Sequence, residues 1–249
     1  MNLQKLYSFL LKRSLYGMNY GGGVDFRNSG ELNVLKYIRK KFDNQQKNVV
    51  FDVGANIGNY SKVLSEFFKD TATIYSFEPS EKTFEKFIQN TTGIVNIIPN
   101  SIGFSDVEET RMLFTNNEAS GLASVYQRNL EHFDITMNLS EKIELSTIDK
   151  YCESHNIDKI HFLKLDIEGH ELNALKGAER MIDGGRINFI QFEFGGCNID
   201  SKTYFQDFYY LLKDKYRIYR ILKNGLYEIS KYEETLEIFI TVNYLAERK

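Results

Sequence analysis

Several features that mark particular classes of protein are missing or scarce in this sequence. None of its apolar runs approaches the ~20 residues that a membrane-spanning helix needs. No small-residue cleavage site follows the short apolar run at residues 9–11, so a secretory leader is not expected. The only two cysteines, Cys152 and Cys197, have neither metal-ligand spacing nor the pattern of a disulfide framework. We therefore expect reduced thiols in a cytoplasmic protein.

A strong charge of one sign is also lacking. The formal net charge is −3, and the Lys and Arg residues are scattered along the chain rather than clustered. Proteins that bind nucleic acids or anionic membranes usually concentrate basic residues on one surface. The sequence therefore predicts no nucleic-acid partner and no membrane span.

The residues that are present predict one large α/β domain. The chain has 249 residues, of which 42% are apolar and 26% charged, as in ordinary globular proteins. From residue 49 onward, short β-rich runs alternate with amphipathic helical segments, which is typical of parallel strands joined by crossover helices. The expected strands are residues 49–51, 73–77, 95–98, 142–145, 160–165 and 187–194, and the expected helices are residues 59–69, 80–90, 147–155, 170–182 and 201–213.

Three regions depart from this alternation. Residues 1–48 have a helical pattern broken by Gly21, Gly22 and Gly23, and we interpret them as an N-terminal helical cap on a domain of residues 49–249. The cap could also line the substrate entrance. Residues 103–140 are rich in glycine and polar residues and predict an insertion, a hairpin and a loop, over the sheet edge. Residues 216–222 and 236–245 predict an antiparallel pair of strands at one edge.

The segment from Asp52 to Gly58 predicts a ligand-binding turn between the first strand and its helix. Gly54 permits a tight turn, Gly58 permits close approach at the helix start, and the helix N-terminus offers unpaired N–H groups. Glu78 ends the next strand, where an acid can accept both hydroxyls of a ribose. Its alternative role is that of a surface carboxylate at a strand end.

The same turn argues against a nicotinamide cofactor. It lacks the glycine triplet of the G-x-G-x-x-G fingerprint, which directs helix N–H groups at a pyrophosphate. S-adenosylmethionine has no phosphate, and its ammonium group can be attracted by an acid such as Asp52. Asp52 could equally cap the turn, and both roles are compatible.

Beyond these features, the sequence resembles a known family. The Asp52–Gly58 turn and Phe77-Glu78-Pro79 look like motifs of class I S-adenosylmethionine-dependent methyltransferases. The stretch from Phe162 to Glu171, continuing to Ala178, is similar to the K-x-D-I-E-G-x-E and L-x-G pattern of the FkbM family. The resemblance covers roughly residues 45–245. It implies a Rossmann-like α/β fold with a seven-stranded, mostly parallel sheet, an antiparallel last strand and helices on both faces.

The resemblance also implies a cofactor site and methyl transfer to oxygen, commonly on sugars or other hydroxyl groups of glycans and secondary metabolites. The residues expected to bind S-adenosylmethionine are Asp52, Gly54, Ala55, Asn56, Gly58, Tyr60, Glu78, Pro79, Asn100, Ser101 and Asp166. Among these, Asn100 and Ser101 follow the third strand, where the fold usually contacts the adenine.

The chemistry is expected around the end of the 160–165 strand. A sugar hydroxyl is a weak acid, so a base has to accept its proton as the new bond forms. Asp166, Glu168 and His170 are the candidate bases, and Lys164 lies on the same strand face as Asp166. Lys164 could instead simply fix the loop through an ion pair, and His170 could be a surface residue at a helix N-terminus.

Two further possibilities concern the acidic residues. Asp166 and Glu168 could hold a divalent cation that lowers the pKa of the acceptor hydroxyl. The absence of a His/Cys cluster makes this the less favoured interpretation, and zinc in particular is not expected. Glu193 lies in an otherwise apolar run, where it either faces the substrate or ends a strand.

The leading hypothesis is therefore an O-methyltransferase that acts on a hydroxyl group, with a small molecule or glycan as the acceptor. One alternative is a nicotinamide-dependent oxidoreductase. The missing glycine triplet counts against it. So does the absence of a Tyr-x-x-x-Lys pair, since the residue four positions after Tyr151 is His155. Another is a non-catalytic scaffold. The sequence carries no readable code for the acceptor, and a homodimer is possible.

Overall fold

The structure is a computed structural model that describes residues 3–22, 26–42 and 47–249. Residues 1–2, 23–25 and 43–46 of the expected N-terminal cap lie outside the described residues. Eight strands form the main sheet, in the order β10-β9-β11-β8-β7-β1-β2-β3. Their bounds are β1 Asn48–Val53, β2 Ala72–Phe77, β3 Ile97–Asn100, β7 Ile160–Leu165, β8 Ile187–Phe194, β9 Tyr216–Leu222, β10 Gly225–Glu228 and β11 Val242–Arg248.

The pairing of the strands confirms the expected Rossmann-like topology. β3, β2, β1, β7 and β8 are parallel neighbours, whereas β11 is antiparallel to both β8 and β9. The last strand is thus antiparallel, as predicted. It lies between β8 and β9 rather than at the edge, because it pairs with both of them. The short strand β10 folds back on β9 and adds an eighth strand outside the seven expected.

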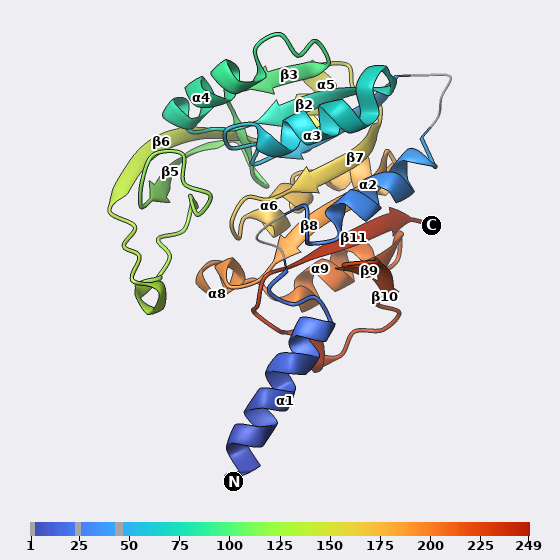
Figure 1. The fold of residues 1–249 in the computed structure, drawn as a ribbon. Helices are drawn as coiled ribbons and strands as arrows, with labels where there is room; N and C mark the ends of the chain where they lie inside the picture. The colour runs from blue at the N-terminus through green and yellow to red at the C-terminus, as the bar shows by residue number, and fades with distance from the viewer. Residues whose placement is uncertain (1–2, 23–25, 43–46) are drawn as a thin grey trace.

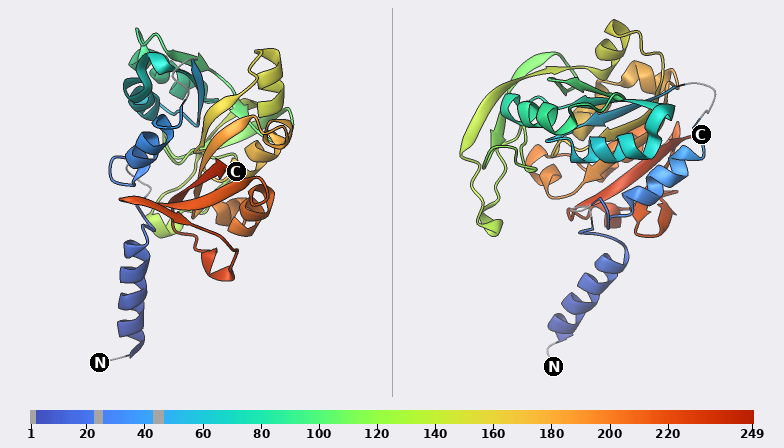
Figure 2. Two further views of the ribbon diagram at one scale, coloured as in Figure 1. Left: turned by 90° about the vertical axis from the view of Figure 1, so that its right-hand side faces the viewer. Right: turned by 45° about the horizontal axis from the view of Figure 1, so that its top comes forward.

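Helices cover both faces of the sheet (Figures 1 and 2). One apolar cluster packs α2, α3 and α4 against the sheet, and a second packs α5, α6, α7 and α9 against it. The helix bounds are α1 Leu3–Gly17, α2 Glu31–Arg39, α3 Asn59–Phe68, α4 Glu81–Thr91, α5 Ile148–Ser154, α6 Glu171–Lys176, α7 Glu179–Asp183, α8 Cys197–Ser201 and α9 Phe205–Leu212, with single 3-10 turns at Lys69–Thr71, Glu131–Phe133 and Glu234–Leu236. No helix among these described residues is long and apolar enough to cross a bilayer.

The two N-terminal helices behave differently. α2 packs on the sheet through Val34, Leu35 and Ile38, which are fully buried. α1 buries none of its residues and projects away from the domain (Figures 1 and 2). Of the two helical segments that we interpreted as a cap, only α2 therefore covers the sheet.

A second, smaller sheet occupies the predicted insertion. It has three strands, β4 Gly103–Phe104, β5 Glu109–Thr115 and β6 Leu139–Ser146, in the order β4-β6-β5. β5 and β6 form an antiparallel pair joined by a long connection at residues 116–138. The strand expected at residues 142–145 thus exists, but it belongs to this sheet and not to the main one.

Gly177 divides the helix expected at residues 170–182. A Cβ atom at this position would lie 2.0 Å from the backbone oxygen of Ser105, so only glycine lets the segment after β4 approach so closely. The chain forms α6 before Gly177 and α7 after it. The close approach brings Ser105 to the start of α6, where the candidate catalytic residues lie.

Candidate active site

A cavity lies at the carboxyl ends of β1, β2 and β7, under the smaller sheet. It holds about 800 Å³ of space, part of which is open to solvent. Of the residues expected in the site, those that line the cavity are Gly54, Asn56, Glu78, Pro79, Asp166, Glu168 and His170. Residues of the smaller sheet and its connection complete the wall, including Phe104, Leu113, Ser120, Val125, Ile143 and Leu145.

The turn after β1 is held against both neighbouring strands. The N–H groups of Gly54 and Ala55 donate to the backbone oxygen of Phe77 at 3.0 and 2.9 Å. Gly54 has a φ of +83°, and a Cβ atom there would lie 1.9 Å from the backbone oxygen of Asp166. Glycine is therefore required for the β1 and β7 loops to meet at the cavity.

Glu78 is fixed by backbone donors on both carboxylate oxygens. Oε2 accepts the N–H of Asn56 at 3.0 Å, and Oε1 accepts the N–H of Ser80 at 3.0 Å. Burial raises the pKa of Glu78 to about 7, against the effect of these two hydrogen bonds. Each oxygen retains a further lone pair, so the carboxylate can also accept hydrogen bonds from a ligand.

The other expected cofactor residues lie behind the cavity wall rather than in it. Asp52 is fully buried on the α3 side, where its Oδ2 accepts a hydrogen bond from Ser61 at 2.6 Å while its Oδ1 is without a partner among the described residues. The Oδ1 of Asn100 accepts a hydrogen bond from the hydroxyl of Tyr151 at 2.7 Å. Ala55, Gly58, Tyr60, Asn100 and Ser101 also do not line the cavity.

Lys164 orients Asp166 from below the cavity. Its Nζ lies 2.8 Å from the Oδ2 of Asp166 and 4.6 Å from the ring centre of Tyr60. The Lys164 side chain is 4% exposed, whereas that of Asp166 is 40% exposed. Burial alone would lower the pKa of Lys164. The nearby carboxylates have the larger effect and raise this pKa, and they belong to Asp166, Asp52 and Glu31. A fixed cation therefore holds a carboxylate that can reach the cavity.

Glu168 follows Asp166 in a loop with an unusual backbone. Its φ is +52°, and its carboxylate forms an ion pair with Arg128, which lies in the connection at 116–138. Burial raises the pKa of Glu168 to about 8, although Arg128 acts in the opposite direction. The loop is closed from beneath by Glu171, whose carboxylate accepts the N–H groups of Ile167 and Gly169.

His170 has no ring nitrogen left to accept a proton from a substrate. Nδ1 is 3.0 Å from the hydroxyl of Tyr126, and Nε2 is 3.0 Å from the hydroxyl of Ser105. Burial lowers the pKa of His170 to about 4, so the ring is neutral at physiological pH. This arrangement favours a positioning role, in which His170 ties the loop to the smaller sheet, over that of a base.

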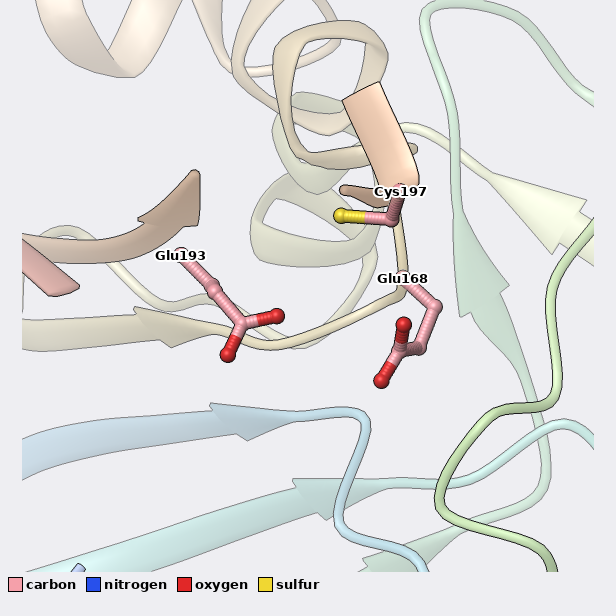
Figure 3. Close-up of side chains that lie close together, drawn as sticks. All are labelled: Glu168, Glu193 and Cys197. Atoms are coloured by element: carbon pink, nitrogen blue, oxygen red, sulfur yellow. The ribbon is translucent and has the colours of Figure 1, made fainter. Parts of the chain in front are cut away.

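Glu193 lies at the end of β8, next to the cavity. It is 8% exposed, and burial together with the carboxylates of Asp166 and Glu168 raises its pKa well above the usual range. Glu168, Glu193 and Cys197 offer three ligand atoms within 4.8 Å of one another (Figure 3). Sequence reasoning missed Cys197 here because it considered the spacing of cysteines alone.

Three residues of the connection at 116–138 contact the loop that carries Asp166 and were also missed. Ser124 donates to the backbone oxygen of Glu168 at 2.7 Å, and Tyr126 and Arg128 make the contacts described above. A long connection without regular periodicity gives no sequence signal for such contacts.

Comparison with known proteins gives one family. Residues 52–224 match the model of the methyltransferase FkbM domain. A curated relative, the hexuronic acid methyltransferase AglP of Haloferax volcanii, is 27% identical over 174 residues, which cover 70% of this chain. The matched region spans 65% of the length of that relative.

Solved structures with a related fold show low sequence identity. A putative rRNA methylase from Clostridium thermocellum has a TM-score of 0.47 and 12% identity, with 89% of this chain and 98% of that chain covered. Fibrillarin from Aeropyrum pernix, solved with natively bound S-adenosylmethionine, has a TM-score of 0.45 and 10% identity, with 88% and 76% covered.

Proposed function

The chain belongs to the FkbM family of methyltransferases, and on this premise we propose that it transfers a methyl group from S-adenosylmethionine to a hydroxyl group of a sugar. The observation that carries the proposal is that Glu78 and Asp166 line one cavity. They follow β2 and β7, the two neighbours of β1, and adjacent strands are about 4.8 Å apart. A ribose-binding acid and a candidate base thus lie about two strand spacings apart.

The first wall of the cavity suits the cofactor. The remaining lone pairs of Glu78 can accept the two ribose hydroxyls, and backbone groups of the 54–58 turn lie beside them. The apolar side chains of Leu113, Ile143 and Leu145 offer a surface for an adenine ring. These features fit S-adenosylmethionine without requiring a phosphate site.

The second wall suits the reaction. When bound, S-adenosylmethionine supplies an electrophilic methyl group, and the protein has to orient the acceptor oxygen and take its proton. Asp166 is the base in this proposal, because its carboxylate reaches the cavity and Lys164 fixes its direction. Lys164 and His170 are positioning residues.

The acceptor is the finer part of the proposal. The name of the relative from Haloferax volcanii specifies a hexuronic acid, so sugars with a uronic acid are the first acceptors to test. We propose that the reaction takes place in the cytoplasm, as the reduced cysteines expected from the sequence suggest. A homodimer remains compatible with the structure.

Two measurements test the function together. Calorimetry should show micromolar binding of S-adenosylmethionine and S-adenosylhomocysteine and none of NADH. Transfer of labelled methyl from S-adenosylmethionine should then occur to uronic-acid oligosaccharides, and the label should resist alkali, because a methyl ether on a hydroxyl is stable to alkali and a methyl ester is not. Binding of NADH alone would favour the oxidoreductase alternative. Binding of S-adenosylmethionine with no transfer to any hydroxyl in a broad glycan panel would contradict sugar methylation and favour a scaffold.

A further inference from the structure

The cluster of Glu168, Glu193 and Cys197 has no role in cofactor binding as described above. It lies where the loops after β7 and β8 meet (Figure 3). Its three side chains come from different segments and point toward a shared space.

One member of the cluster, Glu193, has no partner among the described residues. No hydrogen bond or ion pair reaches the carboxylate of Glu193 from the part of the chain that the structure describes, although the residue is only 8% exposed. A buried carboxylate is costly unless it is paired, hydrogen-bonded or bound to a metal. The side chain of Glu193 is directed toward Glu168 and Cys197, so the missing partner belongs in the space between them (Figure 3).

The charges around this space point to a cation. The carboxylates of Asp166, Glu168 and Glu171 raise the pKa of Glu193, and Lys164 lowers it. Lys164 already donates a hydrogen bond to Asp166. Arg128 already forms an ion pair with Glu168 and lies 3.6 Å from a carboxylate oxygen of Asp200. Protons or a bound cation must therefore offset the charge of the carboxylates beside Glu193.

We propose that Glu168, Glu193 and Cys197 bind a divalent cation of borderline softness, such as Zn²⁺. Carboxylates and thiolates are both ligands of Zn²⁺, whereas Mg²⁺ prefers oxygen alone. Bonds of about 2.0–2.3 Å set tetrahedral ligand atoms about 3.3–3.8 Å apart. The three ligand atoms lie within 4.8 Å of one another, so small side-chain rotations bring them to the ion.

The surroundings provide the second layer that metal ligands usually have. Arg128 pairs with Glu168 and also approaches Asp200. These two contacts fix the direction of the Glu168 carboxylate, which is the ligand. Three protein ligands leave one position open on a tetrahedral ion. The open position accepts the acceptor hydroxyl and makes its proton easier to remove. This last step rests on the proposed function, whereas binding of the cation does not.

Co²⁺ is the probe for the site, because thiolate ligation gives it an intense near-ultraviolet charge-transfer band. Protein stripped with a chelator should bind one Co²⁺ with this band, and an equivalent of Zn²⁺ should displace it. Cys197→Ala should abolish the band. Cys152→Ala, which removes the other buried cysteine, should leave it unchanged. Glu193→Gln should weaken Co²⁺ binding at least tenfold.

The circular dichroism spectrum and S-adenosylmethionine binding of each variant should match wild type, which separates loss of the metal from loss of the fold. A wild-type protein that binds S-adenosylmethionine but no stoichiometric Co²⁺ would overturn the metal site alone. A Cys197→Ala variant that folds and keeps the charge-transfer band would overturn it as well. Metal binding without methyl transfer would instead contradict the proposed function and leave the site intact.

Discussion

The two ends of the cavity differ in the partners that their carboxylates have. At the β2 end, Glu78 accepts backbone N–H groups from Asn56 and Ser80, both within 22 residues of it in sequence. At the β7 and β8 end, Glu168 depends on Arg128, 40 residues away, and Glu193 has no partner in the described chain. Glu78 is thus held by backbone groups that are near in sequence, whereas the acids at the β7 and β8 end depend on distant segments or on a group that the protein does not supply among the described residues.

The largest effect is expected from the acceptor end. Asp166→Asn keeps the shape but removes the proton acceptor, so we expect kcat to fall by about 10²–10⁴-fold. The dissociation constant of S-adenosylmethionine should change by less than about threefold. Asp214→Asn, at an exposed position, is the control and should behave as wild type. A loss in cofactor binding equal to the loss in kcat would show that the two ends do not act separately.

A smaller effect is expected from the cofactor end. Glu78→Ala removes the acceptor for both ribose hydroxyls, and we expect calorimetry to show about 10–100-fold weaker binding of S-adenosylmethionine, equal to about 1.4–2.7 kcal/mol. Glu141→Ala removes a neighbouring acid that bonds to Ser80 without lining the cavity. Binding by that variant should stay within about threefold of wild type. Equal losses in both variants would point to the stability of the turn rather than to ribose contact.

The affinity for a ribose-containing ligand should also depend on pH, because Glu78 titrates near neutral pH. Glu78 has a pKa of about 7 in the free protein, and ribose hydroxyls bind its ionised form better. Affinity should therefore rise with pH below about 7, by up to about tenfold per pH unit, and level off above it. Adenosine is the suitable probe, because it carries the ribose but no titrating amino group. Glu78→Gln should bind it weakly at every pH, and a profile of unchanged slope in that variant would assign the titration to another group.

Comparison with the sequence shows why some residues of the cavity wall could be predicted. Its residues are close together in the chain, so Gly54, Asn56 and Glu78 could be assigned from one turn and the next strand end. The Lys164–Asp166 pair follows in the same way from strand alternation. Local patterns of this kind are visible in a single sequence.

The rest of the site depends on contacts between distant segments. Arg128 comes from a connection whose sequence has no regular periodicity. Cys197 can be recognised as a candidate ligand only because the fold places it beside Glu193. Asn100 was expected near the adenine, but its side chain is bonded to Tyr151, which approaches from α5. The strand at 142–145 was correctly recognised and assigned to the wrong sheet, because a pattern of alternation does not specify the partner of a strand.

The smallest effect is expected from the contact between the connection and His170. Tyr126→Phe removes the hydroxyl that lies 3.0 Å from Nδ1 and leaves the ring in place. We expect the free energy of unfolding to fall by about 1 kcal/mol, as measured by denaturant titration. If His170 is a positioning residue, the pH profile of kcat should keep its shape. A shifted profile would make His170 a catalytic base after all.

The contacts of Ser124, Tyr126 and Arg128 with the 168–170 loop also bear on the timing of the reaction cycle. The smaller sheet and its connection form the roof of the cavity, and these contacts fasten the roof to the catalytic loop. After each transfer, S-adenosylhomocysteine has to leave and a new cofactor has to enter beneath that roof. We expect loss of these contacts to loosen the roof and so to change the rate at which S-adenosylhomocysteine leaves.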